Sequence, residues 1–417
     1  MIPTHVHVVG AGLAGLAAAL TLVERGVRVT VHEAGPAAGG RCRSYFDREL
    51  GCRIDNGNHL LLSGNKAAFA FLDQVGARNT MAGPSSPAFP FIDLASGERW
   101  VVRPNRGRVP FWIFDKRRRV PGTRVSEYLQ MIALGRAGPD ATVSEALRQG
   151  PLFRKLLEPL AVAALNTPPE TGSAQLLSAV VNESLGDGGA ACIPAFPREG
   201  LSESFIDPAV AWLEARGATI RLSSRVAAVH TEAGAVTGLG TESLGADEAV
   251  VLAVPAPVAS ALLPSVRGPD AFEAILNVHF KLDVSEDAIP ERAGFMGMVG
   301  SLSEWVFVKP GVVSVTISAA NRHASMDPVA VAQQVWQEVR TALRLPEPMP
   351  LWRVLREKRA TFAATPDQNR RRPSSSTEFR NLVLAGDWTS TGLPATIEGA
   401  IRSGRRAADD LSSTIRE

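Results

Sequence analysis

The sequence predicts an α/β fold in which one domain is built from separated parts of the chain. The chain has 417 residues, two to three times the length of a domain of about 150 residues. Its first 33 residues follow a strand–helix–strand pattern, and a strand followed by a helix ends the chain. Strands that alternate with helices are typical of a parallel sheet. We therefore expect both ends of the chain to contribute to one domain.

The composition is that of a globular protein. Hydrophobic residues make up 45% and charged residues 21% of the chain, which excludes a disordered protein. The formal net charge of +2 argues against a nucleic-acid-binding protein. Cys42, Cys52 and Cys192 show no C-x-x-C spacing. We therefore expect neither a disulfide framework nor a zinc ribbon, and the pattern fits a reducing compartment.

The N-terminal pattern is a complete βαβ unit. Residues 6–9 form a short apolar strand, an Ala- and Leu-rich helix follows to about residue 25, and residues 27–32 form a second strand. The turn before the helix reads Gly10-Ala-Gly-Leu-Ala-Gly15. Glycines with this spacing allow a tight bend, close approach of a pyrophosphate, and close packing of helix on strand.

Two further features of this unit fit a dinucleotide. The helix begins directly after the glycines, so that the N–H groups of Leu13 and Ala14 face the phosphates. Glu33 lies 21 residues after Gly12, where a carboxylate binds a ribose hydroxyl. Because strand, helix and ribose acid all agree with the glycine pattern, we predict a dinucleotide site.

The rest of the chain shows weaker patterns. Helices are predicted at residues 69–75, at residues 142–165 with breaks at Pro151 and Pro159, at residues 327–343, and from about residue 395. Strands are predicted within the block 219–254, including residues 225–229, and at residues 305–308, 312–318 and 381–385. We therefore expect a strand-rich middle and a second sheet.

Two later motifs add to the evidence for a nucleotide cofactor. Gly39-Gly40-Arg41 combines close backbone approach with a guanidinium that matches a phosphate. The run Leu384–Gly404 contains Gly386-Asp387 and Ala395-Thr396-Ile397. With the βαβ unit, these motifs resemble the three fingerprints of the amine-oxidase and phytoene-desaturase superfamily of FAD enzymes. The resemblance implies a discontinuous Rossmann-like FAD-binding domain with an inserted substrate domain made of a mixed sheet plus helices.

Three further runs narrow the resemblance, namely Asp55-Asn-Gly-Asn-His-Leu-Leu-Leu62, Glu357-Lys-Arg-Ala-Thr-Phe362, and Gly386-Asp-Trp-Thr with Gly392-Leu-Pro-Ala-Thr-Ile-Glu398. They resemble the hydroxysqualene dehydroxylase family, the squalene-associated FAD enzymes of bacterial hopanoid biosynthesis. The resemblance implies a long isoprenoid substrate, hydroxysqualene, which receives a hydride from reduced flavin at an allylic carbon and yields squalene. A phytoene-type FAD desaturase and a non-catalytic isoprenoid escort are the alternatives.

The resemblance also implies how the cofactor is held. It implies non-covalent FAD, since no cysteine lies near the C-terminal fingerprint. Asp387 is expected at the ribityl chain, and the N-terminus of the last helix at the flavin pyrimidine ring, where its dipole favours the anionic reduced flavin. Ala37 stands where broader superfamily members often have an arginine, which puts one phosphate contact in doubt. The implied cofactor-binding residues are Gly10, Gly12, Leu13, Ala14, Gly15, Glu33, Gly39, Gly40, Arg41, Gly57, Asn58, His59, Val226, Gly386, Asp387, Ala395, Thr396 and Ile397.

His59 is the candidate catalytic residue. It lies in the Asp55–Leu60 segment, which matches the superfamily segment along the flavin ring, so its imidazole is expected near N5 as a proton donor to the departing hydroxide. The alternative is a histidine that only hydrogen-bonds backbone or flavin, with an ordered water as the acid. The six other histidines, including His5, His7 and His32, show no spacing such as H-E-x-x-H, and we predict no metal site.

We predict two domains with interleaved segments. Residues 1–75, 200–255 and 375–417 are expected to form the FAD-binding domain, because they contain the fingerprints and the middle strand-rich block. Residues 76–199 and 256–374 are expected to form the substrate-binding domain.

Residues 99–124 combine basic and aromatic side chains. Nine Lys and Arg residues surround Pro110-Phe-Trp-Ile-Phe114, with Asp115 as the opposing charge. An apolar tip within a basic collar suits an anionic lipid surface, and a water-insoluble substrate makes such docking useful. Alternatively, Phe111, Trp112 and Phe114 pack inside the substrate domain, and the arginines form a solvated face.

No targeting or spanning segment is evident. The N-terminus has no basic region before its apolar run, and no stretch reaches the ~18 apolar residues that span a bilayer. We therefore expect a cytoplasmic protein, with peripheral contact on the inner face of the cell membrane through residues 99–124. A second dinucleotide fingerprint is absent from the sequence, and the electron donor for the flavin is left unidentified.

Overall fold

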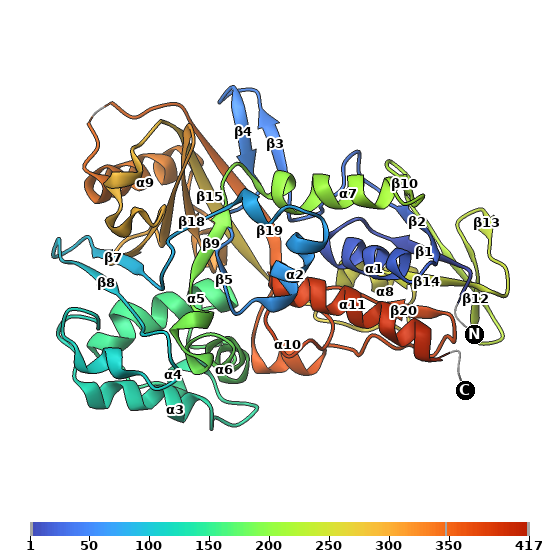
Figure 1. Cartoon of the computed structure of the whole chain (residues 1–417), viewed down its shortest axis with the longest axis horizontal. Helices are drawn as coiled ribbons and strands as arrows, with labels where there is room; N and C mark the ends of the chain where they lie inside the picture. Colours follow the sequence, from blue (N-terminus) through green and yellow to red (C-terminus); the bar gives the residue numbers. More distant parts are fainter. Residues whose placement is uncertain (1–2, 347, 415–417) are drawn as a thin grey trace.

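A parallel sheet joins distant parts of the chain. The computed structural model describes residues 3–346 and 348–414 and is shown in Figure 1. Its parallel strands stand in the order β10 (Thr219–Arg221), β2 (Arg28–His32), β1 (His5–Val9), β14 (Glu248–Leu252) and β20 (Leu382–Leu384). In the central strand, Val6 lies between Val29 and Ala249. The N-terminal, middle and C-terminal segments thus share one sheet.

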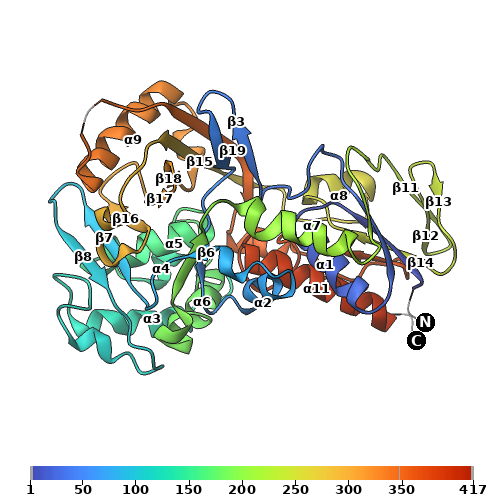
Figure 2. The same ribbon diagram turned by 45° about the horizontal axis from the view of Figure 1, so that its top comes forward.

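The two faces of this sheet are covered differently. One face carries α1 (Leu13–Glu24), α2 (Lys66–Gln74), α7 (Asp207–Glu214) and α11 (Ile397–Thr414), which share an apolar core with Val6 and Val8. The other face carries a small antiparallel sheet of β11 (Val229–Glu232), β12 (Ala235–Leu239) and β13 (Glu242–Ser243), and next to it α8 (Ala256–Leu262). Figure 2 shows this small sheet at its right-hand side. Strand β1 is therefore buried on both faces.

A second, mixed sheet lies beside the first (Figure 1). Its strands stand in the order β19 (Trp352–Phe362), β15 (Phe272–Lys281), β18 (Val312–Ile317), β17 (Trp305–Lys309), β16 (Phe295–Val299), β7 (Phe89–Asp93) and β8 (Arg99–Val102). β16 and β7 pair in parallel, and the other neighbours pair antiparallel. Helix α9 (Pro328–Leu343) packs on this sheet, with the rings of Trp336 and Phe280 5.2 Å apart.

Short elements complete the structure. A helical group beside β7 and β8 contains α3 (Gln130–Leu134), α4 (Val143–Ala146), α5 (Glu158–Leu165) and α6 (Ala174–Asn182). Helix α10 (Pro366–Arg370) precedes β20. The remaining strands are β3 (Ser44–Asp47) paired with β4 (Cys52–Asp55), and β9 (Pro194–Pro197) paired with both β5 (Leu61–Leu62) and β6 (Met81–Ala82). These short strands connect the segments that build the two large sheets.

One predicted strand is wrong. Residues 222–228 are irregular, and β11 begins at Val229, so residues 225–229 do not form the expected strand. The chain here follows the end of β2 instead: the Ser223 amide donates to the Gly35 carbonyl at 2.8 Å and the Ser224 amide to the Glu33 carbonyl at 2.7 Å. Local hydrogen bonds to a loop therefore replace a sheet ladder.

The predicted helix break at Pro159 is also wrong. Residues Phe153–Leu157 form a π-helical turn that continues directly into α5, with Pro159 in the first turn of α5. Bonds in a π turn run from i to i+5, which relieves the proline of the i to i−4 bond that it cannot make. The break at Pro151 is confirmed, since α4 ends at Ala146 and the next helix begins at Pro151.

The predicted α/β fold is confirmed by the two large sheets and their helices. The domain boundaries stay a prediction. Within residues 3–346 and 348–414, none of the helices is both long and apolar enough to cross a membrane.

Candidate functional site

The turn after β1 leaves an open cradle. An added Cβ at Gly10 would lie 2.4 Å from the Ala253 carbonyl oxygen, and one at Gly15 would lie 1.9 Å from the Gly10 carbonyl oxygen. The fold itself therefore requires glycine at both positions. At Gly12, by contrast, an added Cβ meets no described atom within 4 Å. Protein packing does not explain this glycine, and the space beside it is open to a ligand.

Helix α1 begins at this cradle. Gly12 is its N-cap, and none of the described side chains caps it. The first N–H groups of a helix have no partner within the helix. The amides of Leu13 and Ala14 are therefore available to an anion, which the helix dipole also favours.

The second glycine turn lies against the first. The Gly39 amide donates to the Ala11 carbonyl at 2.8 Å, and Gly39 forms a β-bridge with Gly12. Gly40 has a φ of 57°, and an added Cβ there would lie 3.6 Å from the Cα of Gly12. The Glu33 carboxylate accepts a hydrogen bond from the Ala11 amide at 2.9 Å. The structure thus brings both glycine turns and Glu33 together at the carboxyl end of β1.

The C-terminal segment closes onto the second turn. Oδ1 of the buried Asp387 lies 2.7 Å from Nη2 of Arg41. Arg41 also donates to the Ala360 carbonyl at 2.7 Å. The nearby Asp387 carboxylate raises the pKa of the Arg41 guanidinium. Arg41, which the sequence assigned to a phosphate, is therefore ion-paired to the residue expected at the ribityl chain.

The other expected cofactor residues border this region in the chain. Gly386 has a φ of 154° and precedes Asp387. Ala395 and Thr396 lead into α11, which begins at Ile397. The half-buried Val226 lies in the irregular segment that hydrogen-bonds the Glu33 carbonyl.

Residues 56–59 are held against the mixed sheet. Asn277 on β15 donates to the Asn56 carbonyl at 3.2 Å and accepts from the Thr316 hydroxyl at 2.9 Å. Asn58 Nδ2 donates to the same hydroxyl at 3.1 Å. The buried Asn58 Oδ1 has no hydrogen-bond partner among the described residues. An added Cβ at Gly57 would lie 3.3 Å from Asn277 Nδ2, so the segment and the sheet approach closely.

A buried ion pair anchors the start of this segment. Oδ2 of Asp55 lies 2.5 Å from Nζ of Lys309 on β17, and both side chains are less than a tenth exposed. Oδ1 of Asp55 accepts from the Ser44 hydroxyl at 2.6 Å and from the Leu201 amide at 2.8 Å. Because both carboxylate oxygens are satisfied, this buried charge is well supported.

His59 follows this anchor and is half-buried. Burial lowers its pKa to about 4, with Asp55 opposing the shift and Lys309 adding to it. The imidazole is therefore neutral at pH 7. A neutral imidazole donates or accepts a hydrogen bond but does not act as a cationic acid.

Sequence reasoning missed the polar side chains of the mixed sheet. Asn277 faces Thr316 across β15 and β18, and His279 faces Ser314 two pairs further along. A signal was present, because these polar residues recur at every second position of otherwise apolar strands and so share one face. Lys309, at the end of β17, gave no such signal.

The comparisons with known proteins agree with this geometry. Residues 13–282 and 300–412 match the family described as flavin containing amine oxidoreductase. Three hydroxysqualene dehydroxylases are 42% to 46% identical to the chain. That of Sinorhizobium fredii is 45% identical over 98% of this chain and 98% of its own. The chain belongs to the hydroxysqualene dehydroxylases, within the flavin-containing amine oxidoreductase family. The predicted resemblance is confirmed, and the family implies a flavin.

Other proteins that the chain resembles are more distant. A probable zeta-carotene desaturase of Synechococcus elongatus is 25% identical over 97% of this chain and 98% of its own. The solved structure of cyclohexylamine oxidase from Brevibacterium oxydans matches over 100% of both chains with a TM-score of 0.70 and 18% identity, which confirms the fold. The lower identity to the desaturase favours the main prediction over the desaturase alternative.

The residues present fit the flavin of the hydroxysqualene dehydroxylase family. The open position at Gly12, the uncapped start of α1 and the adjacent Glu33 carboxylate form a cradle suited to a dinucleotide. The buried Asn58 Oδ1 has no hydrogen-bond partner among the described residues, so a donor group of a bound ligand could satisfy it.

Proposed function

We propose that this protein uses FAD to reduce hydroxysqualene to squalene in hopanoid biosynthesis. The observation that carries the proposal is the 45% identity to a hydroxysqualene dehydroxylase over 98% of both chains. The open glycine cradle and the segment 56–59, fixed against the mixed sheet, supply the geometry that such an enzyme needs.

The reaction breaks an allylic C–O bond and forms a C–H bond. The oxygen takes up a proton and leaves as water, and positive charge develops on the allylic carbon. When bound, reduced flavin supplies the hydride. The chain must therefore orient the cofactor, hold an isoprenoid beside it, and guide a proton to the departing oxygen.

For the cofactor, we propose FAD without a covalent link. Gly12, Gly40 and the start of α1 hold the pyrophosphate, Glu33 the adenosine ribose, and Asp387 the ribityl chain. Support against a cysteinyl link comes from Cys42 and Cys192, whose burial raises the pKa of both thiols and keeps them protonated. The other proposed contacts are Gly10, Leu13, Ala14, Gly15, Gly39, Arg41, Gly57, Asn58, His59, Val226, Gly386, Ala395, Thr396 and Ile397.

For the proton, we propose that His59 acts as a neutral hydrogen-bonding group. Its pKa of about 4 leaves the ring uncharged at neutral pH, so it orients a water that gives its proton to the departing oxygen, and the hydroxide left from that water takes a proton from solvent. This role joins the two sequence-based interpretations, since His59 takes part in proton delivery while the water is the acid.

An anaerobic experiment tests the proposed reaction. The purified flavoprotein is reduced, hydroxysqualene is added, and the return of oxidised-flavin absorbance is followed together with squalene. One squalene per reoxidised flavin is the expected result. Reduced flavin that persists without squalene would favour a desaturase, and a preparation without flavin would favour an escort. Gly12→Ala, which removes the open cradle position, serves as the flavin-free control.

The long isoprenoid substrate is insoluble in water, and one surface suits its delivery from a membrane. Five large apolar side chains at the edge of the helical group are more than half exposed, namely Val109, Phe111, Phe114, Leu129 and Ile132. Trp112, in contrast, is buried against Tyr128, with ring centroids 5.3 Å apart. Trp112 therefore packs inside the protein, whereas Phe111 and Phe114 are accessible to a lipid surface.

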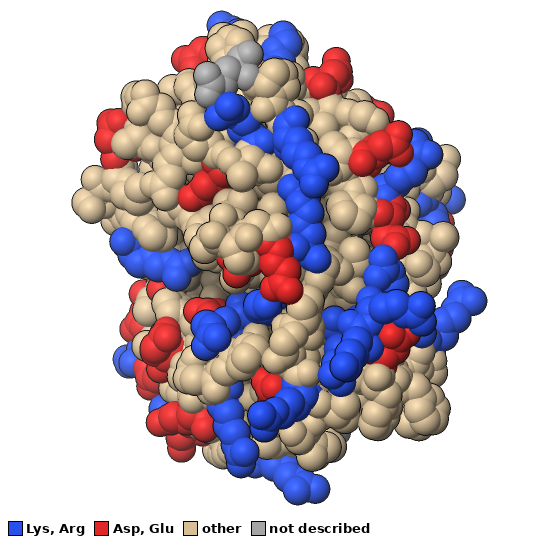
Figure 3. All heavy atoms as spheres, turned by 90° about the vertical axis from the view of Figure 1, so that its left-hand side faces the viewer, with Lys and Arg blue, Asp and Glu red and all other residues tan. Residues whose placement is uncertain are grey.

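Basic side chains lie close to these apolar residues in the chain. Arg106, Arg108, Lys116, Arg117, Arg124 and Arg136 are exposed, although Arg108 pairs with Asp187 and Arg117 with Asp115. Figure 3 looks at the end of the molecule that carries α3 and β8; Lys and Arg side chains lie over much of it, with Asp and Glu side chains and uncharged surface between them. Such a surface suits anionic lipid headgroups, where each cation contributes about 1 kcal/mol. We propose that the protein docks here on the inner face of the cell membrane.

Vesicle sedimentation tests the docking. Wild-type protein is expected to sediment with phosphatidylglycerol-containing vesicles and to stay in solution with phosphatidylcholine vesicles. Phe111→Ser with Phe114→Ser should abolish sedimentation. Leu351→Ser, at another exposed apolar position (61% exposed), is the matched control and should bind as the wild type does. Equal binding by both variants would contradict the proposed surface.

A further inference from the structure

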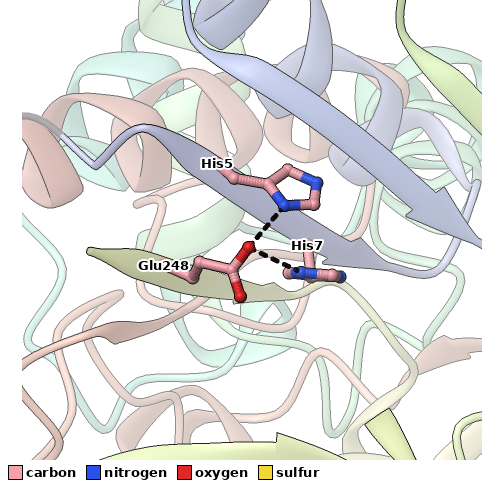
Figure 4. Close-up of side chains that lie close together, drawn as sticks. All are labelled: His5, His7 and Glu248. Atoms are coloured by element: carbon pink, nitrogen blue, oxygen red, sulfur yellow. Dashed lines mark hydrogen bonds and ion pairs between the residues drawn. The ribbon is translucent and has the colours of Figure 1, made fainter. Parts of the chain in front are cut away.

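A cluster of histidines and glutamates lies on the face of the parallel sheet away from α1 and α11. His5 and His7 project from β1, and Glu248 from the neighbouring strand β14, as Figure 4 shows. His5 and His7 share a face because side chains alternate along a strand. His32, on β2, lies next to His7. His5, His7 and His32 are all buried.

The donor atoms of three residues converge. Oε1 of Glu248 lies 2.7 Å from Nδ1 of His5 and 3.9 Å from Nε2 of His7. A tetrahedral zinc ion with bonds of about 2.0 Å places its ligand atoms about 3.3 Å apart. The two measured separations lie on either side of this value, so small shifts of the carboxylate bring all three atoms to ligand distance.

The outer nitrogens of both rings are already held. Nε2 of His5 lies 2.9 Å from the Thr30 hydroxyl, and Nδ1 of His7 lies 3.1 Å from Nε2 of His32. Histidines that bind metals commonly use their second nitrogen in this way, which fixes the ring orientation. Here these outer contacts leave Nδ1 of His5 and Nε2 of His7 directed at Glu248 (Figure 4).

One of these inner nitrogens has no partner. Nε2 of His7 is buried, makes no hydrogen bond within the described part of the chain, and belongs to a residue that is 1% exposed. A buried polar atom without a partner is uncommon and calls for a bound ligand or a functional reason. This atom is the one that faces the Glu248 carboxylate.

We propose that His5, His7 and Glu248 bind a zinc ion. Two imidazoles and one carboxylate are a ligand set that zinc accepts, with water in the fourth position. Gly10, where the dinucleotide cradle begins, is three residues beyond His7, about 10 Å along an extended strand. The ion is therefore separate from the flavin chemistry and ties β1 to β14. Spacing along the chain gave no sign of it, because Glu248 comes from a distant segment.

The charges around the site are compatible with a cation. The Glu248 carboxylate is steadied by the Gly245 amide, 2.9 Å from Oε2. Nη2 of Arg28 lies 3.8 Å from Oε1, and this side chain is 67% exposed, so it can turn into solvent. Glu242 lies near His7 and His32, and its charge is balanced by Arg221, whose Nη1 lies 3.0 Å from Glu242 Oε2.

Zinc titration of the chelator-treated holoenzyme tests the proposal. Calorimetry is expected to show one zinc ion per chain, and zinc K-edge absorption spectroscopy to show imidazole nitrogen ligands. Glu248→Gln should weaken binding at least about 100-fold, because changes in outer partners alone cost about 10- to 100-fold. Thr30→Val, which removes one outer partner, should weaken it about 10-fold. His230→Gln, at an exposed histidine on β11, is the control and should bind as the wild type does.

Two results would overturn the zinc site. One is the absence of stoichiometric binding by the wild type; the other is equal binding by Glu248→Gln, which would identify an adventitious surface site. Flavin content and circular dichroism show whether each variant folds, and Thr30→Val keeps the test valid if Glu248→Gln does not. Zinc should raise the melting temperature of the wild type and not that of Glu248→Gln. Squalene formation plays no part in this test, so its outcome is independent of the proposed reaction.

Discussion

At the scale of single residues, the site depends on buried polar groups that satisfy one another. Lys309 and Asp55 pair in the interior, and Asn277, Thr316 and Asn58 form a hydrogen-bonded chain beside them. Buried charges are tolerated when paired, and removing one partner leaves the other uncompensated. The segment 56–59 therefore keeps its position only while this network is complete.

Replacing Lys309 with methionine should test this dependence. The Asp55 carboxylate would keep its bonds to Ser44 and Leu201 but lose its cation, and we expect a loss of about 3 kcal/mol in unfolding free energy. Chemical denaturation measures the change. Adding Asp55→Asn should recover part of the loss. Arg117→Met, which removes an exposed ion pair, is the control and should change stability little. Equal losses of stability in Lys309→Met and Arg117→Met would contradict the special importance of the buried pair.

The neutral state of His59 predicts an unusual pH dependence. Because its pKa is about 4, flavin reoxidation by hydroxysqualene should not lose rate between about pH 6 and pH 8, where an ordinary histidine titrates. His59→Gln keeps a hydrogen-bond donor and should retain most of the rate, whereas His59→Leu should lose about 100-fold. Stopped-flow absorbance measures both. A rate that falls as an ordinary imidazolium loses its proton would show that His59 is the cationic acid.

At the scale of elements, the three glycines of the first turn have different duties. Gly10 and Gly15 are fixed by contacts within the fold, whereas Gly12 borders open space and has an ordinary φ of −74°. We predict that Gly12→Ala folds but purifies without flavin, because its Cβ occupies the pyrophosphate position. Gly15→Ala should fail to fold, since its Cβ meets the Gly10 carbonyl at 1.9 Å.

Circular dichroism and flavin absorbance separate these outcomes. Gly138→Ala is the control, because an added Cβ there also meets no described atom within 4 Å and the residue is remote from the turn in sequence. It should fold and retain flavin. A flavin-loaded Gly12→Ala protein would contradict the assignment of this turn to the pyrophosphate.

The helices and strands also differ in how well the sequence predicted them. Elements with a strong local pattern were predictable: β1, β2 and α1 around the glycines, and α9 with its apolar stripe. The long strands β15 and β19 were missed, since they carry polar residues that are satisfied only by partners far along the chain, as Asn277 is by Asn56. Glu398 shows the same limit. It lies in the first turn of α11, where the helix dipole favours a carboxylate, but its carboxylate accepts from the amides of Ala67 and Ala68 at the start of α2.

At the scale of the whole molecule, the N-terminal, middle and C-terminal segments meet in one sheet, and the motifs that we assign to the flavin follow those strands. These motifs could be recognised from the sequence because each of them is local. The alternating polar residues of β15 and β18 indicate a shared polar face, but which strands pair depends on contacts between β15 and β18 and between β1 and β14. No local pattern encodes these pairings, so the partners within the polar face and the histidine cluster emerge only from the folded chain.

Buried titratable groups should also give the molecule opposing responses to acid. Burial lowers the pKa of His279 to about 4, with Asp55 and Asp47 opposing the shift and Lys309 adding to it. The unfolded chain takes up this proton near pH 6.5, so His279 destabilises the fold as pH falls from about 6.5 to about 4. Burial raises the pKa of Glu304 to about 7 despite Arg322 beside it. The folded chain binds this proton first, so Glu304 destabilises the fold as pH rises from about 4.5 to about 7.

Comparing each of two variants with the wild type isolates these responses, because the contributions of all other titrating groups are the same in both proteins and cancel. Glu304→Gln removes the group that protects the fold in acid, and its melting temperature should fall more than that of the wild type between about pH 7 and pH 5. His279→Asn removes a group that acts in the opposite sense, and its fall should be smaller. In terms of unfolding free energy, each variant should differ from the wild type in this pH response by on the order of 1 to 2 kcal/mol, since one pKa unit corresponds to about 1.4 kcal/mol. If the melting temperatures of all three proteins change with pH in the same way, these side chains reach solvent in the folded state and keep ordinary pKa values.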